Sequence, residues 1–458
     1  MWDNVEIDRH YTGVFKILNE EISGELIYNK QKGIILLNLT KQLDQKTVFG
    51  KSYGSIEIIT GKLNSGATVT LFNNRCTNNH TLAFGSQQLN FVSKYLIWSN
   101  RECSNSQQYN KMVCTLRNAY EWSGFSAFEE SDLGIKMKSE FESKSFSWFD
   151  AKITFSTFLN NSLYTPPQEE ETKIIQLLLI EIETNKKQSV IDFISIRNKI
   201  LALISFAIKN NVNIEEQYLC DYDDSYVIAG DITDYRKHYL WTDEPMLDII
   251  KTRRWEYNFT LNDLSEDKDY NNELSKLEPV LNLYLSLFKY EDMPVEMVFL
   301  NIIQALETFH SRFFYDNKKD KYIQSVVDRF GDSEMYKNLL LSPTQMDKNC
   351  GFIILVSRLN DLLIGKGDGL FCEYYLDGGK YAQTIADTRH YYTHYGKSKE
   401  SKALKDEELL EAIYVLRMLL EYHICLILDL EKRDAIAQQL RIHWDWKYLQ
   451  EQQAKKHS

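Results

Sequence analysis

The sequence has little of what marks exported or disulfide-bonded proteins. Only six of its 458 residues are proline, and no stretch is rich in Pro, Gly or Ser, so no flexible linker is predicted. The seven cysteines are scattered along the chain and never form a C-x-x-C pair. This spacing argues against a disulfide framework and against a cysteine-built zinc site. We therefore expect reduced thiols and a cytoplasmic protein.

Long hydrophobic runs are also absent. The most apolar stretches, "IIQLLLIEI" and "YHICLILDL", are too short and too closely flanked by charge to span a bilayer. The N-terminal "MWDNVEIDRHYTGVF" lacks the basic and apolar regions of a signal peptide. We expect no membrane partner.

The chain also has no excess of basic over acidic residues. The 53 Lys and Arg face 65 Asp and Glu, which gives a formal net charge of -12. A nucleic-acid-binding protein usually carries a basic face, so this balance argues against a broad one. Net charge does not report local distribution, and a recessed basic site is compatible with it.

The first third of the chain has the pattern of β-structure. Short segments of β-branched and aromatic residues are separated by Gly, Asn and Asp. They are "TGVFKIL", "SGELIYN", "GIILLNL", "SIEIITG", "ATVTLFN" and "LNFVSKYLIW", with "FSWFDAKITFSTF" and "ETKIIQLLLIEI" as later strands. This pattern predicts an antiparallel sandwich or barrel over about residues 10–185.

The period changes to helical after about residue 187. "SVIDFISIRNKILALISFAIKN" predicts a helix that begins near a serine, whereas the acidic "CDYDDSY" within the mixed region 220–265 is interpreted as a solvated loop. Further helices are expected at 269–290, 294–315, 318–330, 346–365, 379–394, 405–430 and 432–453. The fold class is therefore α+β. We expect a β-rich N-terminal domain with a connecting region over 1–268, an all-α domain over 269–431 and a C-terminal helix over 432–458.

The segment "DTRHYYTHYG" (387–396) gathers proton-carrying and hydrogen-bonding groups on an expected helix. One interpretation is an ordinary helix surface. A second is a metal site, because His390 and His394 are four residues apart and share a helix face. Glu307 and His310 also have the Glu/His spacing found in di-iron bundles, although the further ligands that either site needs are not evident. His423, in an apolar stripe, is expected to be a hydrogen-bonded core residue.

The third interpretation is metal-free acid–base chemistry on RNA. Histidine can accept and donate protons near neutral pH, and arginine can hold a phosphate through two parallel hydrogen bonds. RNA carries its own nucleophile, the 2′-OH. A base that removes its proton, a cation beside the phosphorane and an acid for the leaving 5′-oxygen suffice for cleavage. The products would be a 2′,3′-cyclic phosphate and a 5′-OH, and DNA would be inert.

The residues "RHYYTH" resemble the R-φ-x(3–5)-H motif of the HEPN superfamily, in which φ is a polar residue. "MPVEMVFLNIIQALETFHSRFF", "ADTRHYYTHYG" and "EAIYVLRMLLEYHICLIL" are similar to successive helices of the ApeA-type HEPN domain. The N-terminal strand segments resemble the β-rich domain of ApeA proteins. The resemblance thus covers most of the chain. It implies a metal-independent ribonuclease, without cofactor, that acts in bacterial anti-phage defence by abortive infection.

The resemblance also implies roles for the motif residues. His394 is expected to act as general base or acid, and Arg389 to hold the scissile phosphate. His stands at the φ position, where Asn is commoner, so His390 either contacts substrate, positions His394 or is a plain surface residue. Glu307 is expected to orient Arg389 or to be a surface charge, and His310, one turn on, is a weaker candidate.

Two tyrosines, Tyr391 and Tyr395, either stack on an unpaired base or pack against helix 405–430. The family's active site is usually assembled from two motif copies, which implies a homodimer with a composite site. RNA (tRNA or another host or phage RNA) is the implied substrate, and a phage-derived trigger and a regulatory N-terminal domain are implied. "KSKESKALK" and "NKKDKY" are either a basic rim or solvated surface. The alternative is a non-catalytic HEPN module for dimerisation or for RNA or nucleotide binding.

Overall fold

The computed structural model describes residues 9–42, 54–82, 86–104, 106–131, 134–161, 174–228, 232–249, 253–289, 292–314, 319–331, 333–341, 353–364 and 380–457. The chain divides into two compact units. The N-terminal unit comprises Met1–Asn198 and Val212–Ile249, and the helical unit comprises Lys199–Asn211 and Ile250–Ser458. Within the described ranges, none of the helices combines the length and apolar character needed to cross a membrane.

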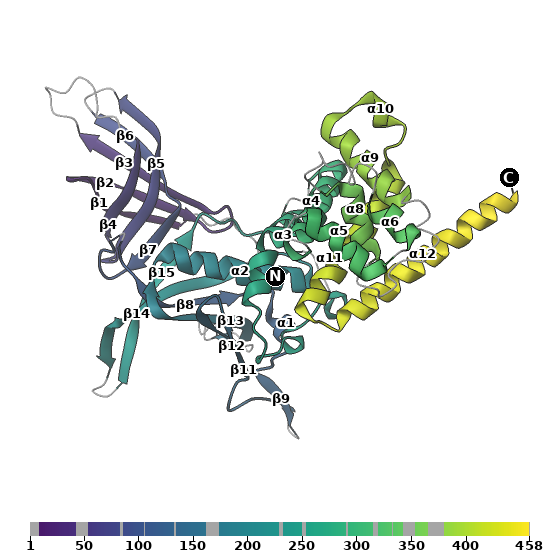
Figure 1. Cartoon of the computed structure of the whole chain (residues 1–458). Helices are drawn as coiled ribbons and strands as arrows, with labels where there is room; N and C mark the ends of the chain where they lie inside the picture. Colours follow the sequence, from purple (N-terminus) through teal and green to yellow (C-terminus); the bar gives the residue numbers. More distant parts are fainter. Residues whose placement is uncertain are drawn as a thin grey trace. The chain divides into compact units, whose positions relative to one another are not determined.

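The first six strands of the N-terminal unit form a closed antiparallel barrel (Figure 1). The ring closes because the long strand β5 pairs with β4 through its first half and with β6 through its second half. The order around the ring is β5-β4-β1-β2-β3-β6. The strands are β1 (Arg9–Ile17), β2 (Glu20–Asn29), β3 (Ile34–Gln42), β4 (Ser55–Leu63), β5 (Thr68–Leu82) and β6 (Ser86–Val92).

The barrel interior is filled by alternate residues of its strands. In β1, Phe15 and Ile17 are buried while Val14 and Lys16, which alternate with them, are exposed, as the two-residue period of a strand requires. The apolar side chains of the other strands join this cluster, with Phe91 of β6 fully buried. The predicted β-rich N-terminal region is confirmed, and of the two architectures considered it contains a barrel.

The sheet continues from the barrel through β7, in the order β7-β15-β14-β8-β13-β12-β11. Two segments, each expected to be a single strand, are each divided into two strands. "LNFVSKYLIW" divides into β6 and β7. "FSWFDAKITFSTF" is a hairpin whose turn residues, Phe149 and Asp150, both have positive φ (56° and 58°), as two-residue hairpin turns favour. The strands are β7 (Tyr95–Ser99), β8 (Tyr109–Leu116), β11 (Ser143–Trp148), β12 (Ala151–Asn161) and β13 (Ile174–Gln188).

The prediction of a solvated loop at "CDYDDSY" was wrong. This segment lies in strand β14 (Ile214–Ile228), which pairs with β8 and with β15 (Ile232–Thr242), so strands continue well beyond residue 185. Two of its acidic residues are paired: Lys187 contacts Asp221 and Asp223, each at 2.6 Å. Asp221 is buried, and the lysine makes its charge compatible with the sheet. A small hairpin, β9 (Phe128–Ser131) and β10 (Gly134–Met137), and the short helix α1 (Tyr120–Ser123) complete the unit.

The predicted helix after residue 187 is confirmed as α2 (Val190–Ile208). Ser189 stands at its start, where its hydroxyl accepts a hydrogen bond from the Asp192 backbone N–H at 3.3 Å. The C-terminal half of α2 belongs to the helical unit, and there Phe206 packs edge-on against Tyr284 with ring centroids 5.3 Å apart.

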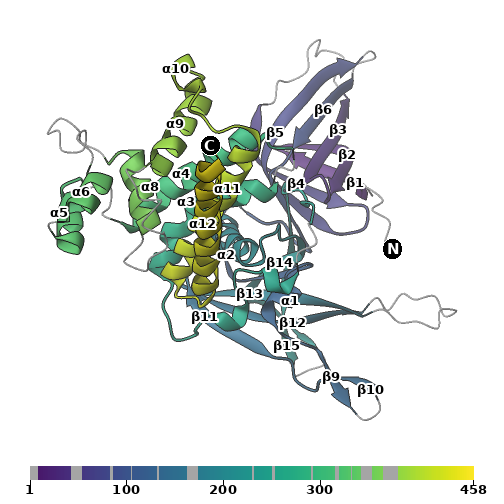
Figure 2. The same cartoon turned by 90° about the vertical axis from the view of Figure 1, so that its right-hand side faces the viewer.

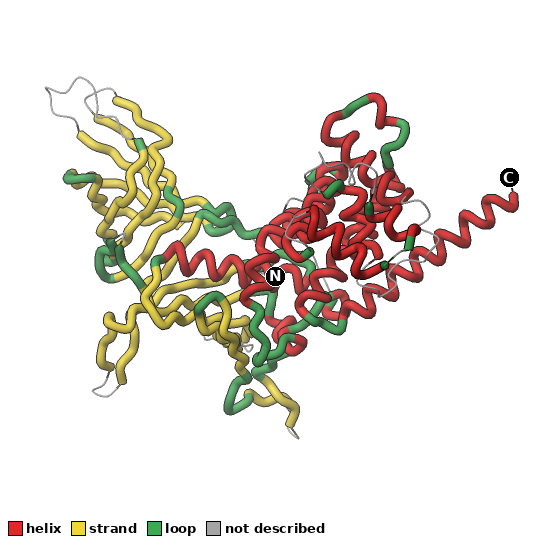
Figure 3. The backbone as a smooth tube through the Cα atoms, viewed as in Figure 1, coloured by secondary structure: helices red, strands yellow, loops and turns green. Residues whose placement is uncertain are grey.

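The helical unit matches most of the expected helices (Figure 3). Residues 346–352 of one predicted helix lie outside the described ranges, and two short helices, α6 and α10, were not predicted. The helices are α3 (Asn271–Lys289), α4 (Val295–Phe313), α5 (Lys319–Phe330), α6 (Glu334–Leu340), α8 (Leu355–Ile364), α9 (Lys380–His394), α10 (Lys397–Glu400), α11 (Asp406–Leu428) and α12 (Lys432–His457), with 3-10 turns at Arg254–Glu256 and Leu261–Asp263.

Helix α4 is central, since it contacts α3, α8, α9 and α11. Helix α11 was expected to bury one apolar stripe, but from Met418 to Cys425 it is buried on every side. Helix α12 lies along α11 (Figure 2), where Glu411 contacts Lys447 at 2.8 Å and His443 at 3.2 Å. Helices α4, α9 and α11 together hold the residues that the sequence singled out.

Candidate functional site

Helix α9 presents a packed face and an open face. Ile385 and Thr388 are buried on the packed face, while His390, Thr393 and His394 are exposed on the other. This division follows the helical period, in which residues four apart lie one above the other. The rings of His390 and His394 have centroids 4.8 Å apart. Two imidazoles therefore lie side by side on an accessible surface.

The segment after α9 folds back on this helix and fixes it. The Thr388 hydroxyl accepts the Leu404 backbone N–H at 3.0 Å, and the Tyr392 hydroxyl donates to the Leu404 carbonyl at 3.0 Å. Lys399 contacts the buried Asp387 carboxylate at 2.6 Å. These bonds lie on the packed side of α9, so they hold the helix without using the exposed histidines.

Arg389 stands between the two faces and points toward α4. Its Nη2 atom lies 3.8 Å from the Glu307 Oε2 atom, with the two side chains 40% and 29% exposed. At this distance the two groups form an ion pair but no hydrogen bond. That Glu307 orients Arg389 remains a prediction.

The two tyrosines next to the histidines have different surroundings. Tyr391 is half-buried, and the Lys405 Nζ atom at the start of α11 lies 5.8 Å from its ring centroid. Tyr395 is 66% exposed and has a positive φ of 49° just past the end of the helix. The Tyr395 ring is thus available for stacking. Of the basic segment 397–405, Lys399 is occupied by Asp387. The segment 317–322 lies partly outside the described residues.

His310 is separate from this surface. It is fully buried, and its Nε2 atom lies 2.9 Å from Asp361 Oδ2, whose other oxygen accepts from Arg329 at 2.7 Å. Burial lowers the pKa of His310, and the Asp361 carboxylate opposes this shift without reversing it. His423 is also buried, with its Nε2 atom 2.8 Å from the Leu362 carbonyl, which confirms the expected core role.

The buried His310 predicts an acid-dependent loss of stability. Its folded pKa is below the ordinary value of 6.5, so between these two values the unfolded chain binds more protons. The contribution of neutral His310 to the free energy of unfolding is fully present above pH 6.5 and is lost as the pH falls toward the folded pKa. We expect the melting temperature of the wild type to fall more steeply below pH 6.5 than that of His310→Gln, which cannot titrate. Equal slopes in calorimetry would contradict this assignment.

The candidate metal ligands do not come together. Across the described ranges, no group of three or more His, Cys, Asp or Glu side chains is placed to hold a metal ion. His390 and His394 have no third ligand in such a group, and His310 is held by Asp361 instead.

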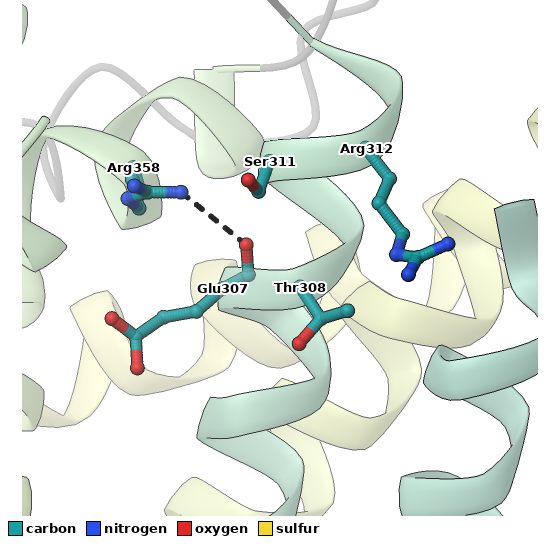
Figure 4. A pocket seen from close by; sticks show the side chains of 5 residues that line it. All are labelled: Glu307, Thr308, Ser311, Arg312 and Arg358. Atoms are coloured by element: carbon teal, nitrogen blue, oxygen red, sulfur yellow. Dashed lines mark hydrogen bonds between the residues drawn. The ribbon is translucent and has the colours of Figure 1, made fainter. Parts of the chain in front are cut away.

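Sequence reasoning missed a pocket next to the Arg389 ion pair. Glu307, Thr308, Ser311 and Arg312 of α4 line it together with Arg358 of α8 (Figure 4). The α4 residues follow helical spacing, which could have indicated Arg312. Arg358 comes from a different helix, so only the tertiary structure identifies it.

Comparison with known proteins gives two family matches. Residues 10–272, more than half of the chain, match the model described as ApeA N-terminal domain 1, and residues 300–434 match the Apea-like HEPN model. The second match contains α9, Glu307 and the pocket. No curated protein and no solved structure matches the chain. The chain therefore belongs to the ApeA family of anti-phage proteins, in which an ApeA N-terminal domain is followed by an ApeA-like HEPN domain.

Proposed function

We propose that this protein is a metal-independent endoribonuclease of an abortive-infection system. HEPN domains typically act on RNA. The observation that carries the proposal is that α9 holds both the exposed His394 and Arg389, whose Nη2 atom lies 3.8 Å from the Glu307 Oε2 atom. A proton carrier and a phosphate-binding cation are the two parts that 2′-OH attack requires.

In the proposed reaction His394 acts as base or acid. A base removes the 2′-OH proton, the 2′-oxygen attacks phosphorus, and the phosphorus–O5′ bond breaks. An acid then protonates the leaving 5′-oxygen, which leaves a 2′,3′-cyclic phosphate and a 5′-OH. Arg389 holds the scissile phosphate as charge builds on it. His390, at a ring-centroid distance of 4.8 Å, positions the His394 ring or contacts the strand.

A homodimer would complete this site. Each chain supplies one arginine and the adjoining histidines, and twofold symmetry would bring a second set beside the first. The exposure of His390 and His394 on one face of α9 is compatible with such an arrangement. One His394 would then serve as base and the other as acid. Tyr391 and the exposed Tyr395 would stack on an unpaired base of the strand.

We further propose that the β-rich N-terminal domain, assigned here to residues 1–268, senses a phage-derived trigger and holds the HEPN domain (269–431) inactive until infection. The protein would act in the cytoplasm on tRNA or another host or phage RNA.

The test is cleavage of total bacterial RNA by the purified full chain in excess EDTA, alone and with lysate from phage-infected cells. We expect cleavage that EDTA does not abolish, with cyclic-phosphate ends that resist ligation to a 3′-OH-dependent adaptor until the phosphate has been opened and removed. Cleavage that requires a divalent cation would overturn the metal-independent mechanism. Absence of cleavage in both conditions, together with retained RNA binding, would favour the non-catalytic module.

A further inference from the structure

The pocket beside Arg389 has the composition of an anion site. Arg358 forms one wall from α8, and Arg312 forms the opposite wall from α4, with the Ser311 and Thr308 hydroxyls between them (Figure 4). Two guanidinium groups and two hydroxyl groups are the donors that hold phosphate oxygens in proteins. The one acidic residue of the lining, Glu307, extends its carboxylate away from Arg312.

The two arginines of the pocket differ in their mobility. Arg358 is only 8% exposed, and it is fixed by donating from Nε to the Ile353 carbonyl at 3.0 Å and from Nη1 to the Glu307 carbonyl at 3.4 Å. Arg312 is exposed and has no ion-pair partner among the residues that the structure describes. A hydrogen-bonded guanidinium thus lies at one side of the pocket and an exposed one at the other.

The pocket is continuous with the proposed cleavage site through Glu307. Glu307 lines the pocket, and its Oε2 atom lies 3.8 Å from the Nη2 atom of Arg389. Three arginines, Arg312, Arg358 and Arg389, stand beside the single carboxylate of Glu307 in this pocket and ion pair. A recessed group of basic side chains of this kind is compatible with an RNA substrate for a chain whose net charge is -12.

We propose that this pocket is a second phosphate-binding site, which holds a phosphodiester of the RNA strand next to the one that Arg389 holds. The inference rests on the proposed function and deepens it. Two phosphates bound by one chain would fix the direction and register of the strand over His394. Arg312 and Ser311 are therefore positioning residues, and Arg358 forms the fixed wall.

The test measures binding separately from cleavage. A labelled single-stranded 2′-O-methyl oligoribonucleotide lacks the attacking hydroxyl, so its affinity for the full chain is measurable by fluorescence anisotropy whether or not the protein is active. We expect Arg312→Gln to weaken binding about tenfold at low salt. It should also reduce the slope of log affinity against log salt by about 0.7, the value for one phosphate contact on a single strand.

Arg441→Gln on α12 is the matched control, because it removes the same charge outside the pocket. Equal affinities and slopes for Arg312→Gln and Arg441→Gln would overturn the inference, as would an oligonucleotide that does not bind the wild type. Arg312-dependent binding without RNA cleavage would instead overturn only the proposed ribonuclease function.

Discussion

Replacing His394 by alanine is expected to lower the rate constant of RNA cleavage by about 10²–10⁴-fold, which is the usual contribution of a general acid or base. The imidazole is exposed at the end of α9, and the bonds that hold this helix come from Asp387, Thr388 and Tyr392 on its other side. The substitution should therefore leave the fold intact. The measurement is the initial rate of RNA cleavage in excess EDTA, with circular dichroism melts of both proteins.

His10→Ala is the matched control for this loss. His10 is also exposed but belongs to strand β1 of the N-terminal unit, where it contacts Glu25 at 2.9 Å. Its removal should leave the cleavage rate within about twofold of the wild type, since surface changes of this kind have small effects. A His394→Ala protein that cleaves as fast as His10→Ala would assign the reaction to another site.

The double variant Arg389→Ala, His394→Ala separates the two function classes. Phage restriction that survives it would require a non-catalytic role for the HEPN domain. Restriction and RNA cleavage that are lost together, in a protein that still melts as the wild type does, would tie defence to these two side chains.

The sequence predicted the helices of the HEPN region because their apolar period is strong and local. The α9 motif could be placed for the same reason, and the approach of Glu307 to Arg389 was expected from family resemblance. The sequence predicted a core role for His423, but not that α11 would be buried on every side from Met418 to Cys425, because burial of Glu421 depends on partners such as Tyr284 of another helix. Contacts between side chains of different helices leave no periodic pattern in the sequence of either helix.

Strand β14 shows the same limit in the other unit. The acidic residues of "CDYDDSY" resemble a loop by composition, and the contacts of Asp221 with Lys187 and Gln107 make its sheet position acceptable. Arg358 likewise reaches the pocket from α8, while the rest of the lining comes from α4. Local patterns therefore indicate elements and motifs, whereas charges that are neutralised across elements become visible only in the assembled structure.

Glu421→Ala is expected to have the largest effect on stability. Glu421 is 1% exposed, and its carboxylate accepts from the Tyr284 hydroxyl at 2.6 Å and contacts Lys209 at 2.7 Å and Arg417 at 3.3 Å. Burial and the neighbouring carboxylate raise the pKa of Tyr284 well above its ordinary value, so the phenol remains a neutral donor. Removing the carboxylate leaves Lys209, Arg417 and the Tyr284 hydroxyl without their shared hydrogen-bond acceptor.

The partners left behind are partly exposed, with Lys209 20% and Arg417 34% exposed, so water compensates part of the lost pairing. The substitution should therefore cost about 2–3 kcal/mol of unfolding free energy, below the cost of breaking a fully buried pair. Glu411→Ala is the matched control, because its carboxylate pairs with Lys447 at the partly exposed surface of α11, where an ion pair contributes about 0–1 kcal/mol. Urea titrations of the full chain, followed by the helical circular dichroism signal, measure both. If Glu421→Ala lowers the free energy of unfolding by no more than Glu411→Ala does, then water fully compensates Lys209 and Arg417 for the lost carboxylate. The Glu421 contacts would then contribute no more to stability than a surface ion pair.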